Sequence, residues 1–158
     1  MSEREDDSMA DAGGVQQVSE LVRLAEISEQ PLLPEAVELA VGGPAYGAVV
    51  VFTGKVRDHD GGQAVSKLEY SAHPQAAKFL RQVCTDVAAE RGLPVAAVHR
   101  VGALDIGDLA IVVAVASAHR AEAFACCSEL VDRIKHEVPI WKRQLFVSGM
   151  SEWVNACG

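Results

Sequence analysis

Several signatures of common protein classes are missing from this chain of 158 residues. No apolar run approaches the roughly 18 residues of a membrane-spanning helix, and the longest, residues 109–116, has the length of a strand. The N-terminus begins with acidic residues rather than a basic stretch followed by an apolar one, so we expect no secretory signal peptide. These features predict a cytoplasmic protein.

Metal-binding and nucleotide-binding motifs are also missing. The four cysteines include no Cys-x-x-Cys pair, and we interpret them as core or incidental thiols. The five histidines have no spacing typical of a metal site, and of these we consider only His119 for a functional role. Gly54-Lys55 is followed by Val56 and lacks the upstream glycine of a P-loop.

The charge of the chain is unevenly distributed. The formal net charge of −8 argues against a nucleic-acid partner. Half of it, −4, comes from residues 1–11, which hold five acidic side chains and one arginine. Residues 133–143, in contrast, hold four basic side chains against Glu137 alone. A local positive site inside an acidic protein indicates a specific anion-binding function.

The order of periodic segments predicts one α+β domain. We expect residues 1–18 to form a disordered acidic tail and residues 19–158 a single domain with an aliphatic core. Expected strands cover residues 21–28, 47–56, 65–71, 95–101, 109–117 and 140–147, and expected helices cover 34–41, 74–91 and 119–137. The order from 65 to 147 is that of a split βαβ unit, so we predict a mostly antiparallel sheet with two principal helices.

Further expectations concern loops and helix faces. Residues 57–62 are predicted to form a mobile polar loop, and the strands on either side of it to pair as a long hairpin. The helical spacing places Ala77 and Phe124 on the inward faces of their helices. The tail after residue 147 is expected to be anchored by Trp153.

Two lysines stand on either side of a helix-ending proline. Lys135 falls in the last helical turn, where the helix dipole favours a cation, and Pro139 turns the chain back toward Lys142. Each lysine alone is most simply a capping or solvent-facing residue. Together in one pocket, the two amines would lower each other's pKa. A neutral lysine acts as a nucleophile or general base and a charged one holds a phosphate, and the sequence leaves both open.

Two other cationic pairs stand at the ends of elements. His119 and Arg120 begin a helix, where free backbone N–H groups bind anions. Lys55 and Arg57 share one strand face by period two and precede a glycine-rich loop. A solvent-facing pair and a polar strand edge are the simpler interpretations. His119 lies roughly 25 Å from Lys135 at about 1.5 Å per helical residue, which argues for a dimer with sites completed across its interface.

In combination, these segments resemble the large, catalytic subunit of molybdopterin synthase over roughly residues 20–155. The matching blocks, each weak alone but specific in this order, include Phe52-Thr53-Gly54-Lys55-Val56-Arg57, His99-Arg100-Val101-Gly102, Ser117-Ala118-His119-Arg120 and Pro139-Ile140-Trp141-Lys142-Arg143. The resemblance implies an α/β hammerhead-type fold and a sulfurtransferase of molybdenum cofactor biosynthesis. The sulfur would come from the C-terminal thiocarboxylate of a ubiquitin-like small subunit and would convert cyclic pyranopterin monophosphate into the dithiolene of molybdopterin.

The resemblance also implies roles for individual residues. Lys135 and Lys142 match catalytic lysines of the family. Matches to substrate-binding positions are Lys55, Val56, Arg57, His119, Arg120, Arg143 and Gln144. Gln144 stands where the family often has Glu, and the segment at Glu152 and Trp153 lacks the basic residue of some members, so the roles of positions 144 and 152 stay open.

The assembly implied by the resemblance is a homodimer with one small subunit at each outer end, a heterotetramer in which His119 and Arg120 serve the neighbouring protomer's site. The resemblance implies no metal and no resident cofactor, and no nucleic-acid or membrane partner. Two alternatives stay open at this point. The chain would be a non-catalytic module that docks a ubiquitin-like sulfur carrier, or an inactive paralogue that serves as a dimer scaffold.

Overall fold

The computed structural model describes residues 17–155, so most of the expected acidic tail lies outside the described residues. Residues 17–21 form a short helical segment that includes the last two positions of that tail. The elements that follow are β1 Val22–Ser28, α2 Pro34–Val41, β2 Ala48–Lys55, β3 His59–Asp60, β4 Gln63–Ala72, α3 Ala76–Arg91, β5 Val95–Arg100, β6 Gly102–Asp105, β7 Leu109–Ser117, α4 Arg120–Glu137, β8 Ile140–Phe146 and β9 Ser151–Asn155.

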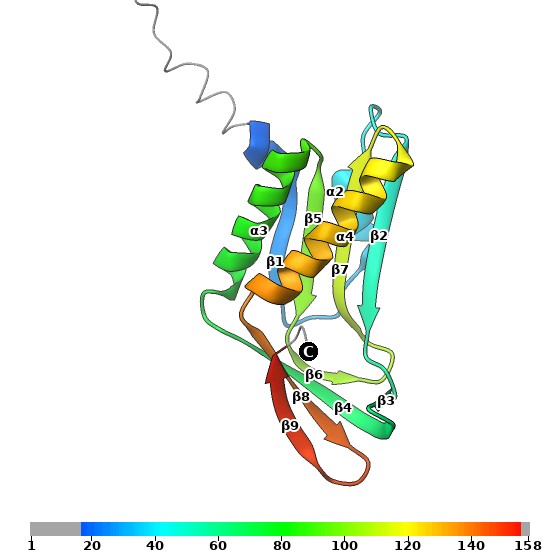
Figure 1. Ribbon diagram of the computed structural model, residues 1–158, viewed down its shortest axis with the longest axis vertical. Helices are drawn as coiled ribbons and strands as arrows, with labels where there is room; N and C mark the ends of the chain where they lie inside the picture. Colours follow the sequence, from blue (N-terminus) through cyan, green and yellow to red (C-terminus); the bar gives the residue numbers. More distant parts are fainter. Residues whose placement is uncertain (1–16, 156–158) are drawn as a thin grey trace, which may run out of the picture.

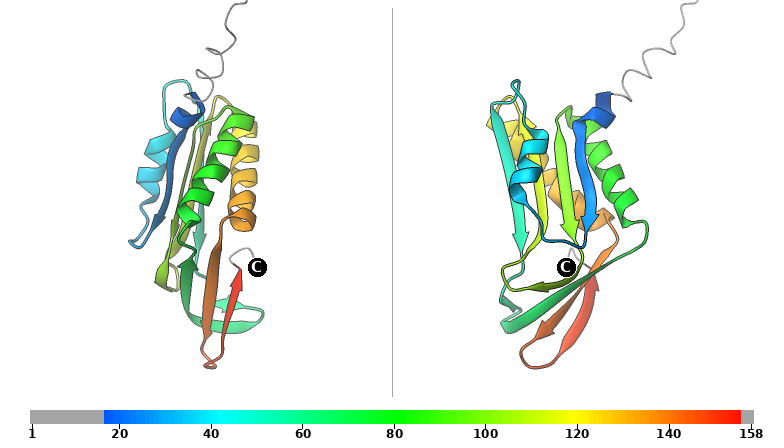
Figure 2. Two further views of the ribbon diagram at one scale, coloured as in Figure 1. Left: turned by 90° about the vertical axis from the view of Figure 1, so that its left-hand side faces the viewer. Right: turned by 180° about the vertical axis from the view of Figure 1, so that it is seen from behind.

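The strands form two sheets that meet end to end (Figure 1). The first sheet has the order β1-β5-β7-β2, in which β1 and β5 are parallel and the other pairs antiparallel. The second sheet has the order β3-β4-β8-β9, with the short β6 paired to β4. Helices α3 and α4 cover one face of the first sheet and α2 covers the other (Figure 2). This architecture confirms the predicted α+β class.

The core is aliphatic and surrounds the central strand β7. Alternate residues of β7 point to opposite faces of the sheet. Val113 and Val115 pack under α3 and α4, and Val112 and Ala114 pack under α2. All four side chains are fully buried, which explains why this strand reads as an uninterrupted apolar run.

No helix in the described part of the chain is long and apolar enough to cross a membrane.

The predicted hairpin between the strands flanking residues 57–62 is wrong. Strand β2 pairs with β7, and β4 pairs with β3, β6 and β8 in the second sheet. The intervening segment is also not an open loop, because β3 pairs with the start of β4 across Gly61-Gly62. Both glycines have positive φ, +56° and +79°, as a tight two-residue hairpin turn requires.

The split βαβ order does not correspond to one sheet. β5 and β7 lie in the first sheet, whereas β4 and β8 lie together in the second. The parallel neighbour of β5 is therefore β1. Between β5 and β7 the chain enters the second sheet as β6 and then returns to the first; β6 starts at Gly102 with a φ of +102° and was not predicted from the sequence.

Three side-chain placements also differ from expectation. Phe124 is 62% exposed, and the buried stripe of α4 instead begins at Ala123. On α3 the buried alanine is Ala76 rather than Ala77. The chain after residue 147 is held by pairing of β9 with β8, while Trp153 remains half exposed. In each case, the tertiary packing shifts the buried face by one position or replaces burial with strand pairing.

Candidate functional site

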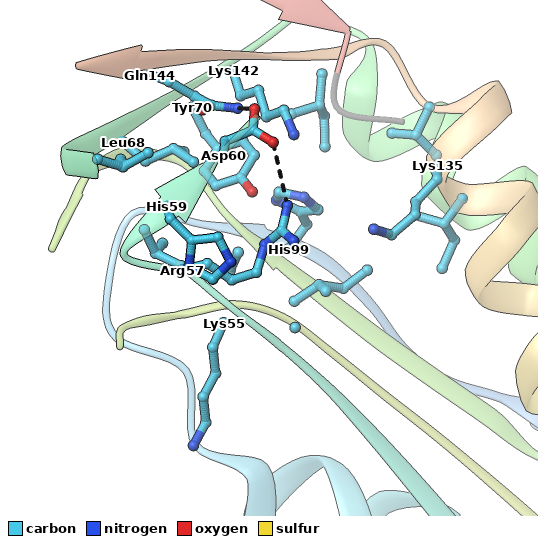
Figure 3. A pocket seen from close by; sticks show the side chains of 18 residues that line it. Lys55, Arg57, His59, Asp60, Leu68, Tyr70, His99, Lys135, Lys142 and Gln144 are labelled. Atoms are coloured by element: carbon cyan, nitrogen blue, oxygen red, sulfur yellow. Dashed lines mark hydrogen bonds and ion pairs between the residues drawn. The ribbon is translucent and has the colours of Figure 1, made fainter. Parts of the chain in front are cut away.

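A cavity of about 240 Å³ lies where the end of the first sheet meets the second (Figure 3). Its walls come from the end of β2 and the segment after it, from β4, β5 and β8, and from the last turn of α4. The polar and charged side chains that line it are Lys55, Arg57, His59, Asp60, Tyr70, His99, Lys135, Lys142 and Gln144.

The turn at Pro139 places two lysines on this cavity. Helix α4 ends at Glu137, and Val138 has an extended conformation with its N–H still bonded to the carbonyl of Ile134. Strand β8 begins two residues later, so Lys135 and Lys142 line the same cavity from a helix end and a strand. Figure 3 shows both amines directed into it. This is the arrangement expected from the spacing of the two lysines around the proline.

Arg57 reaches the cavity from the segment that follows β2, and a short polar network holds it. Its guanidinium is 3.6 Å from a carboxylate oxygen of Asp60. The amide Nε2 of Gln144 donates to the other oxygen of Asp60 at 2.8 Å. Gln144 is buried, and its Oε1 atom has no hydrogen-bond partner among the described residues. Asp60 therefore links the hairpin of β3 and β4 to strand β8.

Replacing Gln144 with Glu should weaken this link at neutral pH. A carboxylate cannot donate to Asp60, and two carboxylates at this distance raise the pKa of one of them. The folded variant then binds more protons than the unfolded chain, so its stability falls as pH rises through the raised pKa. We expect the free energy of unfolding of Gln144→Glu to be lower than wild type by about 1 to 2 kcal/mol at pH 7. The measurement is denaturant unfolding at pH 5 and pH 7.

The control for this experiment is Gln144→Met, which removes the donor without adding a charge. Its deficit in unfolding free energy should be the same at both pH values. A deficit of Gln144→Glu that is also independent of pH would show that the two carboxyl groups do not interact.

Several basic residues predicted for the site lie elsewhere. Strand β2 ends at Lys55, so Arg57 lies in the segment after it and the two side chains do not share a strand face. Lys55 touches the cavity, but its amine points away from it (Figure 3). Arg143 lies on the face of β8 opposite to Lys142 and Gln144. There its guanidinium is 5.9 Å from the centre of the Trp153 ring.

Arg133 faces the acidic residues of α3 and α4, including Glu137 at 2.9 Å. Of the four basic side chains in residues 133–143, two therefore reach the cavity, Lys135 and Lys142. The remaining predicted residues, His119 and Arg120, begin α4 at its other end. At 1.5 Å per residue they are about 22 to 24 Å from Lys135 along the helix axis, so they do not reach the cavity of their own chain.

His99 and Tyr70 are functional candidates that the sequence interpretation missed. His99 ends the buried part of β5 and is 6% exposed. Its Nδ1 atom is 2.8 Å from the carbonyl oxygen of Arg100, and its ring meets that of Tyr70 edge to face at 4.9 Å. Burial, with a smaller contribution from the charge of Lys135, lowers the pKa of His99 to about 4. Burial also raises the pKa of Tyr70. The sequence signal that could have identified His99 is its place at the end of a strand that is otherwise apolar.

The low pKa of His99 makes the stability of the protein depend on pH. Unfolding returns the ring to an ordinary pKa of about 6.5, so between that pH and about 4 the unfolded chain binds an extra proton. Stability contributed by the neutral ring is present above pH 6.5 and is lost as the pH falls toward 4. We expect the wild type to lose about 3 kcal/mol relative to His99→Gln across this window. Parallel pH curves of unfolding free energy for the two proteins would contradict the assignment.

The charged groups in this cavity suit anion binding rather than metal coordination. Within residues 17–155, no group of three or more His, Cys, Asp or Glu side chains is placed to hold a metal ion. Arg57, Lys135 and Lys142 offer hydrogen-bond donors and positive charge. The fold and this cavity together define a small α+β protein with a candidate site for an anionic ligand.

Comparison with known proteins identifies the family. The family model described as MoaE protein matches residues 27–137. Molybdopterin synthase catalytic subunit 1 of Mycobacterium tuberculosis is 42% identical over 132 residues, which covers 81% of this chain and 88% of the relative. The corresponding catalytic subunit of Staphylococcus carnosus is 41% identical over 131 residues, covering 82% and 87%. The chain therefore belongs to the MoaE family of molybdopterin synthase catalytic subunits, enzymes of molybdenum cofactor biosynthesis.

Solved structures show the same fold. The crystal structure of molybdopterin synthase from Staphylococcus aureus matches with a TM-score of 0.77 and 38% identity, covering 82% of this chain and 95% of that chain. A protein–protein complex of subunits 1 and 2 of molybdopterin-converting factor from Helicobacter pylori contains a chain that is 19% identical, with a TM-score of 0.63. These matches agree with the two-sheet architecture described above.

Proposed function

We propose that this chain transfers sulfur from the C-terminal thiocarboxylate of a ubiquitin-like small subunit to cyclic pyranopterin monophosphate, forming the dithiolene of molybdopterin. The observation that carries the proposal is the meeting of Lys135, Lys142 and Arg57 at one cavity. Both reactants are anionic, and a thiocarboxylate and a cyclic phosphate need cationic partners at close range. Family membership makes this reaction the first candidate.

Arg57 is the proposed phosphate ligand. Its guanidinium pairs with Asp60 at 3.6 Å, and the two side chains are 66% and 44% exposed. An exposed ion pair of this length contributes little to stability, so a phosphate can replace Asp60 at small cost. A bidentate guanidinium–phosphate contact is stronger and more directional than the pair it replaces. Val56 and Gln144 line the same cavity and complete the proposed binding wall.

Lys135 and Lys142 are the proposed catalytic residues. Adding sulfur to the pterin side chain and opening the cyclic phosphate both require proton movement, and water must hydrolyse the acyl group to return the carrier as a carboxylate. A lysine beside the reacting atoms supplies and removes these protons, or forms a transient covalent bond. Lys135 is assigned this role because it reaches the cavity beside His99, and Lys142 holds the anionic tail from the facing strand.

We also propose the assembly in which this site works. The Helicobacter pylori protein forms a complex between two subunits of molybdopterin-converting factor, and the same type of small subunit is the proposed sulfur donor here. His119 and Arg120, which do not reach the cavity of their own chain, are proposed to complete the site of a second copy in a homodimer. Lys55 is proposed to contact ligands only at the rim of the cavity, and Arg143 only on the face of β8 that points away from it. Residues 19–158 act as one domain, preceded by the acidic tail, in the cytoplasm.

Reconstitution from purified components tests the reaction. The full chain is mixed with a thiocarboxylated small subunit and cyclic pyranopterin monophosphate, and molybdopterin is measured by mass spectrometry. We expect product with the thiocarboxylate and none with the ordinary carboxylate form of the same carrier. Binding of both carrier forms without any product would favour a non-catalytic docking module instead.

A further inference from the structure

His99 is held in one orientation by contacts on two sides. Its Nδ1 atom lies 2.8 Å from the carbonyl oxygen of Arg100, and a carbonyl oxygen only accepts hydrogen bonds. Nδ1 therefore carries the proton and donates it. The edge-to-face contact with Tyr70, at 4.9 Å and 80° between the ring planes, fixes the ring on its other side. In the neutral ring, the remaining nitrogen, Nε2, has a lone pair available as an acceptor.

The His99 side chain lines a cavity together with several cations that can only donate hydrogen bonds. Arg57, Lys135 and Lys142 line the same cavity as His99, and their charged groups have no acceptor atoms. Asp60, the acid in this wall, already accepts from Arg57 and Gln144. Across residues 17–155, no side chain or backbone group forms a hydrogen bond with Nε2 of His99. A ligand with only anionic groups would satisfy the cations and leave this acceptor unused.

The pterin part of the proposed substrate can supply a hydrogen-bond donor for this acceptor, because its ring system carries N–H groups besides acceptor atoms. We propose that Nε2 of His99 accepts a hydrogen bond from an N–H or O–H group of the pterin, and so fixes the orientation in which the substrate meets Lys135. This inference rests on the proposed function, because it assumes the pterin substrate. Burial and the neighbouring charge of Lys135 keep the ring neutral at physiological pH, which preserves the acceptor.

Two substitutions separate the two nitrogens of the ring. The amide of an asparagine occupies the region of Nδ1, so His99→Asn keeps a donor for Arg100 and loses the acceptor in the cavity. The longer glutamine places an amide oxygen near the position of Nε2, so His99→Gln keeps an acceptor there. His99→Phe keeps an aromatic ring against Tyr70 and has neither nitrogen. Thermal unfolding midpoints of the three variants establish that each one folds.

The test is calorimetric binding of cyclic pyranopterin monophosphate to each full-length protein, followed by single-turnover product formation at saturating substrate. We expect Kd to rise about 10- to 100-fold for His99→Asn and His99→Phe, because a donor of the substrate is left unpaired. His99→Gln should stay within about threefold of the wild type, because an acceptor remains.

The outcomes are distinguishable from failure of the proposed function. No binding of the pterin by the wild type contradicts the proposed function itself. Binding by the wild type with an unchanged Kd in His99→Asn and His99→Phe overturns the role of His99 alone. A lower turnover rate with unchanged Kd also overturns it, because that result assigns His99 to the positioning of Lys135 rather than to the substrate.

Discussion

Replacing Lys135 with alanine should abolish molybdopterin formation while leaving the fold intact. The amine reaches the cavity from the last turn of α4, and its removal deletes a proposed proton donor and acceptor at the reacting atoms. General acid–base catalysis contributes typically about 10²- to 10⁴-fold to a rate, so we expect at least a hundredfold loss of turnover. The measurement is the initial rate of product formation in the reconstituted reaction.

Two further variants serve as controls for the Lys135→Ala experiment. Lys78→Ala removes an exposed lysine of α3 outside the cavity and should keep wild-type activity. Lys135→Arg keeps the positive charge but cannot give up its proton at neutral pH. Inactive Lys135→Arg would indicate proton transfer or covalent catalysis, and active Lys135→Arg would indicate anion binding alone. Full activity of Lys135→Ala would contradict the role assigned to this residue.

Mixing two inactive variants should restore activity if the site is shared between protomers. His119 and Arg120 lie at the far end of α4 from Lys135, about 22 to 24 Å away at 1.5 Å per residue. We expect Arg120→Ala and Lys135→Ala to be inactive as pure dimers. In a mixed dimer, one site combines intact Lys135 with intact Arg120, while the second site carries both substitutions.

The expected size of the restored activity follows from the symmetry of a dimer. Random exchange of protomers makes about half of the dimers mixed, each with one intact site, so about a quarter of wild-type activity should return. The measurement is the product-formation rate after unfolding and refolding the two variants together, with each variant refolded alone as the control. A mixture as inactive as its components would show that Arg120 does not complete the site of a partner.

The elements that carry the site could be predicted from local sequence signals. Pro139 predicted both the end of α4 and the turn after it. The approach of Lys135 and Lys142 to one cavity could be predicted from that turn. The bounds of α2 and β7 also follow from their periodicity and turn signals. These signals are local, because each depends on side chains within a few residues of the boundary.

Features that depend on distant contacts were not predictable in the same way. Strand β2 ends at Lys55, so Arg57 lies beyond it, and period-two spacing cannot reveal where a strand ends. The division of the strands between two sheets depends on which edges meet in space. The sequence interpretation gave His99 no functional role, and its place at the cavity depends on α4 and β8.

The most direct test of the account is to follow the sulfur itself. A small subunit with a radiolabelled thiocarboxylate is reacted with the wild-type chain and cyclic pyranopterin monophosphate, and label is measured in the carrier and in the pterin. We expect label to move to the pterin with the wild type and to remain on the carrier with Lys135→Ala. Equal transfer of label by both proteins, or a pterin product without label, would contradict the claim that this cavity performs the sulfur transfer.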